Sequence, residues 1–219
     1  MEKRLRAIYD AASYLFINKG YARTQMKDIA KHINLSTGML YVYFDSKKTL
    51  LDFLLKATVD PAFFSREHTL PLTANMFSEL NIELIAAFEE NTRTFSSHTD
   101  LVRYPYEEML SDAFDIIRKY GTGCLIIENN PDDVGTLKQY YDNYRTAFFS
   151  QVLGYVQCYI QNGSFRAVPY VDYTVQLIIE TISWWAMHVM NDAYELNREI
   201  DPAVAKAVCL DNLINAYKL

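Results

Sequence analysis

The sequence predicts an all-α protein with a small N-terminal domain followed by a larger helical domain. Apolar residues recur at helical spacing along most of the 219 residues, and no segment shows a convincing strand pattern. The helical segments are separated by glycine, asparagine and proline, which are the residues that usually end helices. We therefore expect one domain over residues 1–56 and a second over residues 57–219.

The first helix is expected from about Lys3 to Asn18, and it should stop at Gly20. Its spacing places several apolar residues on one face. These residues are Leu5, Ile8, Ala12, Leu15 and Phe16. A second, short helix should end near Ile33, because Asn34 tolerates the left-handed backbone that a tight turn between helices needs.

Two serines mark the start of the next two helices. Ser36 is a good N-cap for a third helix, in which Leu40 and Phe44 point inward. Ser46 is the expected N-cap of a fourth helix, which runs to about Val59. Asn34 and Ser36 thus predict a helix, a tight turn and a second helix in close succession.

The larger domain is expected to contain longer helices with aromatic residues. They are placed at about Thr73–Ser97, Asp100–Tyr120, Pro131–Gln161, Pro169–Asp192 and Pro202–Lys218. Glycine, asparagine and other helix-ending residues predict connections at Gly121–Asn130, Asn162–Val168 and Asn191–Ile200. Pro105 should bend or split its helix, since proline cannot donate the backbone hydrogen bond.

Charge divides the chain in the same place as the helical pattern. Residues 1–56 carry ten basic and five acidic side chains, a net charge of +5. The remaining residues carry 11 basic and 22 acidic side chains, a net charge of −11, so the overall value of −6 hides a polarised chain. A basic N-terminal domain can neutralise phosphates, whereas an acidic body is repelled by DNA. Uneven surface charge without function is the alternative interpretation.

The composition narrows the class of protein further. Cys124, Cys158 and Cys209 are odd in number and widely spaced, which favours free thiols in a reducing cytoplasm over disulfides or a zinc site. The most apolar run, Val175 to Met190, is interrupted by polar residues and predicts a buried helix in a protein outside the membrane. No phosphate-binding loop, nucleophile motif or metal-ligand spacing is found, so we expect neither an enzyme nor a cofactor.

The short third helix has the side chains that a DNA-reading helix needs. Thr37, Gly38, Tyr41 and Tyr43 are expected on its outer face, small and polar at the front with phenols behind. Gly38 lets the backbone approach DNA closely, and the N-terminal residues of such a helix meet base edges and phosphates. The pattern favours a helix-turn-helix for the DNA major groove, with an ordinary helical hairpin as the alternative.

This segment resembles the DNA-binding domain of the tetracycline-repressor-like (TetR) family of bacterial regulators. The most specific similarity is the string from Leu40 to Lys47, LYVYFDSK, and the resemblance extends from about Arg4 to Lys56. Upstream matches are Thr24, Ile29, Ala30, Ser36 and Gly38. Two positions depart from the family pattern: Asn34 stands where glycine is usual, and Met39 stands where threonine is common. Any hydrogen bond that the family makes from position 39 is therefore in doubt.

With this resemblance, residues of the N-terminal domain can be given roles on double-stranded DNA. The expected DNA surface is Thr24, Ser36, Thr37, Gly38, Tyr41, Val42, Tyr43 and Lys47. Thr37 and Gly38 are expected nearest the base edges, and Val42 is expected near a thymine methyl. The phosphate contacts are assigned to Thr24, Tyr41, Tyr43 and Lys47. A solvated lysine is the alternative for Lys47.

The last two helices are more apolar than one core-facing stripe requires. This pattern predicts either that they are central in their own domain or that a second subunit covers them. In the family that the chain resembles, the final two helices pair with those of a second copy as a four-helix bundle. A homodimer would read a near-palindromic operator. The expected interface residues are Ile178, Ile182, Trp185, Val208 and Leu213.

Aromatic residues of the larger domain recur at helical spacing and predict the wall of a ligand pocket, with core packing as the strong alternative. The proposed lining is Phe88, Phe95, Tyr104, Tyr141, Tyr144, Phe148, Glu180, Trp184 and His188. Glu180 is unusual because a carboxylate in an apolar helix should be paired or functional, either toward a cationic ligand or in an interface hydrogen bond.

Together these features predict a homodimeric repressor that an unknown small, largely apolar or aromatic effector releases from its operator. The alternative is a structural or site-marking DNA-binding protein with the same fold and no effector. The expected partners of the repressor are double-stranded DNA with a near-palindromic operator, a second copy of the chain and the unknown small-molecule effector, without a membrane.

Overall fold

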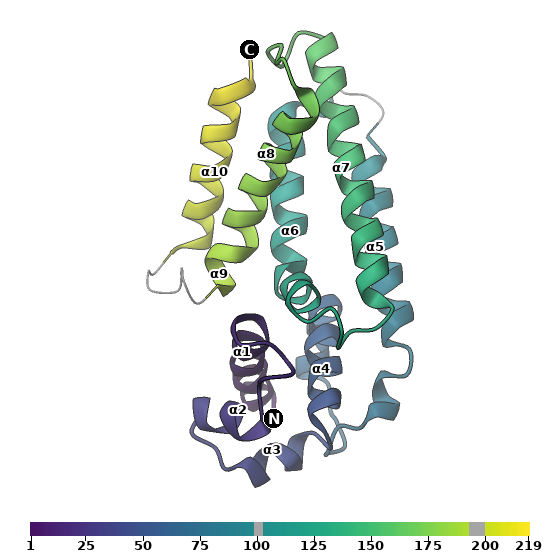
Figure 1. Ribbon diagram of the computed structural model, residues 1–219, viewed down its shortest axis with the longest axis vertical. Helices are drawn as coiled ribbons and strands as arrows, with labels where there is room; N and C mark the ends of the chain where they lie inside the picture. The colour runs from purple at the N-terminus through teal and green to yellow at the C-terminus, as the bar shows by residue number, and fades with distance from the viewer. Residues whose placement is uncertain (99–102, 193–199) are drawn as a thin grey trace. The chain divides into compact units, whose positions relative to one another are not determined.

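The computed structural model describes residues 1–98, 103–192 and 200–219, and these ranges contain helices joined by turns (Figure 1). No strand occurs in them, so the all-α prediction is confirmed. The N-terminal helices are α1 (Glu2–Asn18), α2 (Met26–His32), α3 (Thr37–Tyr43) and α4 (Lys47–Val59). They are followed by the 3-10 helices η1 (Pro61–Ser65) and η2 (Ala74–Phe77). The later elements are α5 (Leu80–Ser96), α6 (Tyr106–Asn129), α7 (Leu137–Gln161), α8 (Val171–Ser183), the π-helix η3 (Trp184–His188), α9 (Val189–Asn191) and α10 (Pro202–Tyr217).

The local signals that predicted the N-terminal helices are confirmed. Asn34 has a φ of 54°, the left-handed conformation expected between α2 and α3. The Ser36 hydroxyl accepts a hydrogen bond from the Met39 N–H at 3.2 Å. Ser46 caps α4 in the same way and accepts from the Thr49 N–H at 3.0 Å. Each serine satisfies one of the N–H groups that a helix start leaves without an internal partner.

The chain divides into two compact units whose boundaries fall inside helices. The first unit contains residues 1–87 and 122–138, and the second contains residues 88–121 and 139–219. The helices α5 and α6 therefore begin in one unit and end in the other. These units are defined by packing, and the domain boundary expected after residue 56 stays a prediction.

The first unit is built around the buried face of α1. Leu5, Ile8, Ala12 and Phe16 are fully buried, as predicted, and Leu15 is half-buried. Leu40 and Phe44 also have no exposed surface, so the inward face predicted for the third helix is confirmed. The Phe44 ring packs against Phe53 of α4 with 5.1 Å between ring centroids, which fixes α3 to the core of this unit.

The connection expected at Gly121–Asn130 is wrong, because α6 continues to Asn129. Both glycines serve close packing instead of ending the helix. A Cβ atom on Gly121 would lie 2.6 Å from the Met187 Cβ, and one on Gly123 would lie 2.7 Å from the Thr58 Cγ2. Tertiary contacts therefore override the weak helix propensity of glycine.

Other helix starts differ from the prediction by several residues. The helix α6 begins directly after Pro105, whose carbonyl accepts from the N–H groups of Glu108 and Met109. The helix expected from Asp100 thus starts at Tyr106, and residues 99–102 lie outside the described ranges. Turns occupy residues 131–136, so α7 starts at Leu137, and η2 precedes α5 where one helix was expected from Thr73. Much of the expected connection at 191–200 also lies outside the described residues, at 193–199.

The tyrosines of the second unit are used in its core, where their hydroxyl groups find backbone partners. Tyr159 donates to the Tyr104 carbonyl at 2.7 Å, and Tyr155 donates to the Phe95 carbonyl at 2.5 Å. Tyr106 is likewise buried, and burial raises the pKa of the Tyr106 and Tyr159 hydroxyls. The phenols therefore contribute apolar area while their polar atoms stay paired. Within the described ranges, no helix has the length and apolarity needed to cross a membrane.

Candidate nucleic-acid interface

The helix α3 combines a fixed inner face with an exposed outer face. Leu40 is fully buried, whereas Tyr41 and Val42 are 48% and 50% exposed. Gly38 is exposed in the first turn, and a Cβ atom there would meet only the Ser36 hydroxyl oxygen, at 3.9 Å. Thr37 and Tyr43 are half-buried at the two ends of the helix. The result is a short, rigid helix whose small first turn can approach another surface closely.

The start of α2 and the turn before it are held by side-chain hydrogen bonds. Gln25 and Asp28 form a reciprocal capping box, in which the Asp28 carboxylate accepts from the Gln25 N–H at 3.0 Å. Asp28 also accepts from Lys19 Nζ at 2.6 Å, and this hydrogen bond holds the pKa of the Asp28 carboxyl below its ordinary value. These contacts orient α2 on the end of α1.

Thr24 has a structural role, which corrects its assignment as a phosphate contact. Its side chain is fully buried, and its hydroxyl donates to the Gly20 carbonyl at 2.8 Å. A buried hydroxyl that already donates its proton inside the protein cannot offer it to DNA. The residue stabilises the turn between α1 and α2.

Lys47 is also engaged inside the protein, and its expected phosphate contact stays a prediction. Its Nζ donates to the Tyr21 carbonyl at 2.9 Å and to the Thr24 carbonyl at 3.0 Å. The same ammonium group lies 4.0 Å from the centroid of the Tyr21 ring. In this arrangement Lys47 holds the turn between α1 and α2 against the start of α4.

Other cations of the first unit are better exposed. Lys27 and Lys31 of α2 and Lys3 and Arg4 of α1 are exposed, and none of them forms an ion pair within the described part of the chain. Sequence reasoning counted these four residues only toward the net charge. Their positions in the sequence could have identified them as candidate DNA contacts, because a basic residue on the outer side of α1 or α2 can reach phosphates beside α3.

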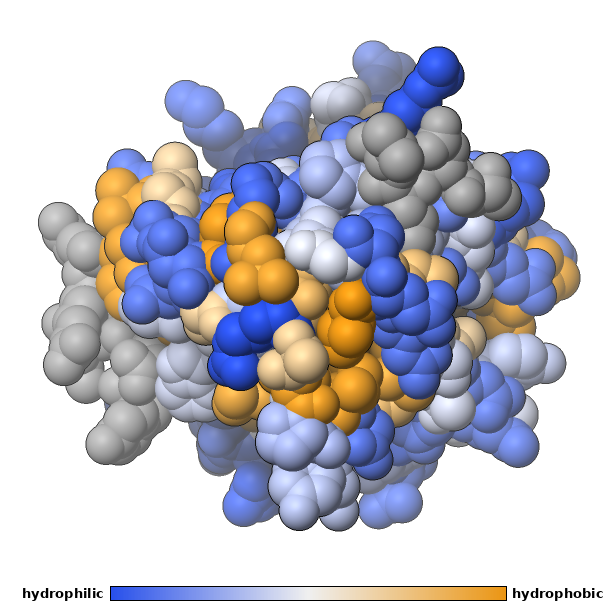
Figure 2. Space-filling view, turned by 90° about the horizontal axis from the view of Figure 1, so that it is seen from above, coloured by the Kyte–Doolittle hydropathy of each residue, from blue (hydrophilic) through white to orange (hydrophobic). Residues whose placement is uncertain are grey.

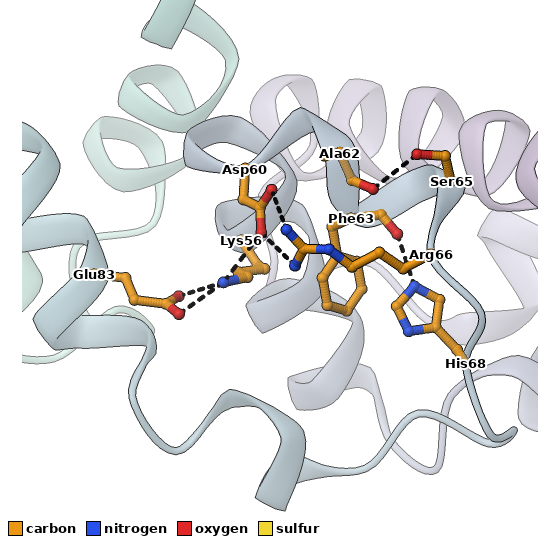
Figure 3. A network of polar contacts seen from close by, with 8 residues as sticks. All are labelled: Lys56, Asp60, Ala62, Phe63, Ser65, Arg66, His68 and Glu83. Carbon is orange, nitrogen blue, oxygen red and sulfur yellow. Dashed lines mark hydrogen bonds and ion pairs between the residues drawn. The ribbon is translucent and has the colours of Figure 1, made fainter.

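The far end of α4 is fixed by a polar network within the same unit (Figure 3). Lys56 Nζ lies 2.7 Å from both carboxylate oxygens of Glu83 in α5 and 3.4 Å from Asp60. Arg66 pairs with Asp60 at 2.7 Å, and the His68 ring bonds to the Phe63 carbonyl at 2.7 Å. These contacts join α4, η1 and the start of α5, so that α4 is held at both ends.

Most of the aromatic residues expected to line a ligand pocket do come together in the second unit. Phe88 stacks on Tyr144 with 5.0 Å between centroids, and Phe95 stacks on Phe148 at the same distance. Tyr141 lies 6.2 Å from Phe88, and Tyr104 packs edge-on against Tyr155. The rings contact one another directly, as in a packed core.

The three remaining pocket candidates lie at the surface of α8 and η3. The Glu180 carboxylate is 54% exposed and accepts from the Gln176 side-chain N–H at 2.5 Å, so it is not a carboxylate in an apolar interior. Trp184 is 43% exposed and stacks on His188. The exposure of Glu180 and Trp184 does not favour an enclosed wall, and the assignment of these three residues to the pocket stays a prediction. The helical period predicted that these residues share one face, but it could not predict which face of α8 packs against the core.

The expected dimer interface also needs correction. Ile178, Ile182 and Leu213 are buried in the core of their own unit, and Trp185 packs half-buried against that core. Only Val208, which is 42% exposed, remains available. Outward apolar residues are Tyr173 and Leu177 on α8, Trp184 at the start of η3, and Val204 and Val208 on α10. The surface seen from above shows hydrophobic side chains gathered between hydrophilic ones (Figure 2).

Comparison with known proteins agrees with the helix-turn-helix geometry. The model of a family described as bacterial regulatory proteins, tetR family, matches residues 8–53, from α1 into α4. Residues 8–53 of the chain are therefore similar to the tetR family. The matched range contains the caps, the turn at Asn34 and the whole of α3.

Two curated relatives are similar over short segments. The HTH-type transcriptional regulator YuxN of Bacillus subtilis (strain 168) is 38% identical over 63 residues, which is 29% of this chain and 22% of the relative. The biofilm operon icaADBC negative regulator IcaR of Staphylococcus aureus (strain Newman) is 43% identical over 53 residues, or 24% of this chain and 28% of the relative. The matches thus span about a quarter of the length of these relatives.

Two solved structures share the fold over almost the entire chain. The ketosteroid transcriptional regulator KstR2 of Mycobacterium tuberculosis is 16% identical with a TM-score of 0.59, covering 99% of this chain and 95% of that one. The probable transcriptional regulatory protein RHA5900 is 17% identical with a TM-score of 0.60, covering 96% and 97%. At these identities the similarity concerns the fold, a helix-turn-helix followed by a larger helical body.

Proposed function

We propose that this protein is a homodimeric transcriptional repressor of the tetR family that binds a near-palindromic operator and is released by a small, largely apolar or aromatic molecule. The observation that carries the proposal is the exposed face of α3 on its buried anchors, Leu40 and Phe44. Thr37 and Gly38 would lie nearest the base edges, with Val42 close to a thymine methyl. Tyr41 and Tyr43 would donate to phosphates, and Ser36 would keep the first turn capped at the DNA surface.

Selection of duplexes from a random pool by the purified full-length protein tests the DNA-binding part of the proposal. A two-fold symmetric dimer should enrich an inverted repeat whose half-sites lie about one or two helical turns apart, about 34–36 Å per turn. Recovery of sequences without any common motif, or of a single unrepeated half-site, would contradict this proposal.

Tyr43→Phe should weaken binding to the selected duplex about 2- to 12-fold. The substitution removes one hydroxyl hydrogen bond to a phosphate, worth about 0.5–1.5 kcal/mol, and keeps the ring. Fluorescence anisotropy with a labelled duplex measures the change. The matched control is Tyr140→Phe on α7, which removes the hydroxyl of a tyrosine that is 45% exposed in the second unit. Equal affinities for wild type and Tyr43→Phe would show that this phenol makes no phosphate contact.

The exposed apolar residues of α8 and α10 support the homodimer. Tyr173 and Leu177 are 74% and 57% exposed on α8, and Val204 is 58% exposed on α10. Large apolar side chains gathered on adjacent helices are the usual sign of a surface that another protein covers. Two copies of the same chain, related by a two-fold axis, would cover this surface with itself.

Leu177→Glu combined with Val208→Glu should convert the dimer into a monomer, since two carboxylates per chain would be buried without partners. Sedimentation analysis should then give the 25.4 kDa chain mass instead of twice that value. Operator affinity should fall with it, because each half-site would be bound separately. Ile82→Glu, at a position that is 63% exposed on α5, is the matched control and should stay dimeric. A double variant that remains a dimer would place the interface elsewhere.

The effector is the least constrained part of the proposal. Aromatic walls suit a flat apolar ligand, and a ligand acts only through its different affinity for the two shapes of the protein, typically about 1–3 kcal/mol. Native mass spectrometry of the purified protein tests for a retained small molecule. Any compound recovered should reduce operator affinity about 5- to 150-fold if it is the effector.

One observation favours the alternative, a site-marking DNA-binding protein without an effector. Phe88, Tyr144, Phe95 and Phe148 stack in pairs at 5.0 Å, which is the packing of a solid core. Mapping of bound sites across the genome separates the two functions. A few sites beside regulated genes support the repressor, whereas many scattered sites with no effect on transcription support site marking.

A further inference from the structure

Tyr21, in the turn between α1 and α2, receives contacts from two helices that are distant in sequence. Its carbonyl accepts from Lys47 at the start of α4, and its N–H donates to the Asn130 carboxamide oxygen just after α6. Its ring packs edge-on against Phe16 with 5.1 Å between centroids. All of these residues belong to the first compact unit. Tyr21 is therefore a joint between the end of α6 and the start of α4.

At the start of α4, the Lys47 ammonium group makes its contacts inside the protein. It bridges the carbonyls of Tyr21 and Thr24 and lies over the Tyr21 ring. Thr24 is fully buried, so its carbonyl has little access to water as a substitute partner. Because Lys47 is the first residue of α4 and follows α3 by three residues, this bridge also fixes the exit of the reading helix.

The Asn130 carboxamide is fully engaged, because its oxygen accepts a hydrogen bond and its nitrogen donates two. Asn130 is 97% buried, since only 3% of it is exposed. Its oxygen accepts from the Tyr21 N–H at 2.5 Å, and its nitrogen donates to the carbonyls of Phe16 at 3.1 Å and Ile126 at 2.8 Å. The Phe16 carbonyl lies in the last turn of α1 and has no partner within the helix, so Asn130 supplies its hydrogen bond. An aspartate would keep the acceptor and lose both donors.

We propose that Lys47 and Asn130 act through Tyr21 as a pair of positioning residues that set the orientation of α3 from the end of α6. The proposal rests on the proposed DNA-binding function and gives Lys47 a role other than a phosphate contact. Asn130 directly follows α6, and its carboxamide connects the end of this helix to the turn within the first unit. Tyr21→Phe should be silent, because the joint uses the backbone and the ring of this residue.

A double-mutant cycle on the full-length protein tests the joint. The variants are Lys47→Ala, Asn130→Ala and the two together, with Asn129→Ala as the control at the exposed neighbour of Asn130. Affinity is measured on the duplex selected with wild type, at several salt concentrations. Each single variant should lose about 10-fold in affinity for the duplex. The double variant should lose little more than either single variant, because the two side chains act on the same turn and either substitution already disrupts it. The salt dependence of Lys47→Ala should keep the wild-type slope.

Amide hydrogen exchange in the DNA-free protein gives a second measurement that does not depend on an operator. Exchange in residues 37–43 should rise in both single variants and stay at the wild-type level in Asn129→Ala and Tyr21→Phe. Lys47→Arg keeps the donors and should restore protection. Asn130→Ser, which keeps a small polar side chain without a charge, provides a second variant if Asn130→Ala fails to fold.

Three results would overturn the inference. The first is a double variant whose loss is the product of the two single losses, since that marks independent residues. The second is a Lys47→Ala slope that flattens by about one unit with unchanged exchange, which is the behaviour of a simple phosphate contact. The third is unchanged exchange in residues 37–43 for both single variants. Failure to select any duplex contradicts the proposed function instead. The exchange experiment would then still test whether Lys47 and Asn130 position α3.

Discussion

Gly38→Glu should reduce affinity for the selected operator about 100-fold or more while leaving the fold intact. The new carboxylate would stand at the front of α3, where bases and phosphates are expected, and like charges brought together cost several kcal/mol. The fold should tolerate it, because a Cβ atom at this position meets only the Ser36 hydroxyl oxygen at 3.9 Å. A glutamate in the first turn also favours the helix. Thermal unfolding and fluorescence anisotropy measure the two effects separately.

The control for this change is Gly154→Glu in α7. It adds the same charge and the same side chain at a helical glycine whose Cβ would have no neighbour within 4 Å. Its operator affinity should stay near that of wild type. If Gly38→Glu binds as well as Gly154→Glu, the first turn of α3 does not face DNA, and the proposed reading surface is wrong.

Gly123→Val should lower the free energy of unfolding by about 1–3 kcal/mol, the usual cost of forcing extra atoms into a packed region. The added Cβ would lie 2.7 Å from Thr58 Cγ2, 2.9 Å from its Oγ1 and 3.1 Å from its Cβ. Thr58 has little freedom to move, because it is buried and its hydroxyl donates to the Leu54 carbonyl at 3.0 Å. Urea unfolding followed by circular dichroism measures the loss.

A second substitution at the contact makes this prediction specific. Thr58→Ala removes the two closest atoms, so Gly123→Val with Thr58→Ala should be less destabilised than the sum of the single effects. Gly154→Val, in α7, adds the same side chain in open space and should cost nothing or stabilise slightly. If the losses of unfolding free energy for Gly123→Val and Thr58→Ala are strictly additive, the new valine does not clash with Thr58.

The positions that sequence reasoning placed correctly depend on neighbours a few residues away. Ser36 and Ser46 cap helices because each is followed by a helical segment whose first N–H groups need an acceptor. Asn34 adopts a positive φ because the turn is too short for any other path. Leu40 and Phe44 are buried because they lie one turn apart on a helix with one apolar side.

Most of the positions that the structure places differently from this reasoning depend on residues far along the chain. Thr24 and Lys47 match the family pattern in type and spacing, yet both make hydrogen bonds within the turn between α1 and α2. Gly121 and Gly123 have the composition of a helix end, yet they lie inside α6 because Met187 and Thr58 leave no room for a side chain. Ile178 and Glu180 were assigned to an interface and a pocket without knowledge of which side of α8 the core covers.

The sequence by itself determined the helical class, the helix-turn-helix and the resemblance of this segment to the tetR family, because these follow from local periodicity, caps and a short string of residues at fixed spacing. Only the tertiary structure decided which cations are engaged inside the protein, which aromatic residues fill the core and which apolar residues of α8 and α10 remain outside. The physical reason is that helical period assigns each side chain to a face of its helix. What covers that face is set by contacts such as those of Asn130 with Tyr21, made between segments more than 100 residues apart in the chain.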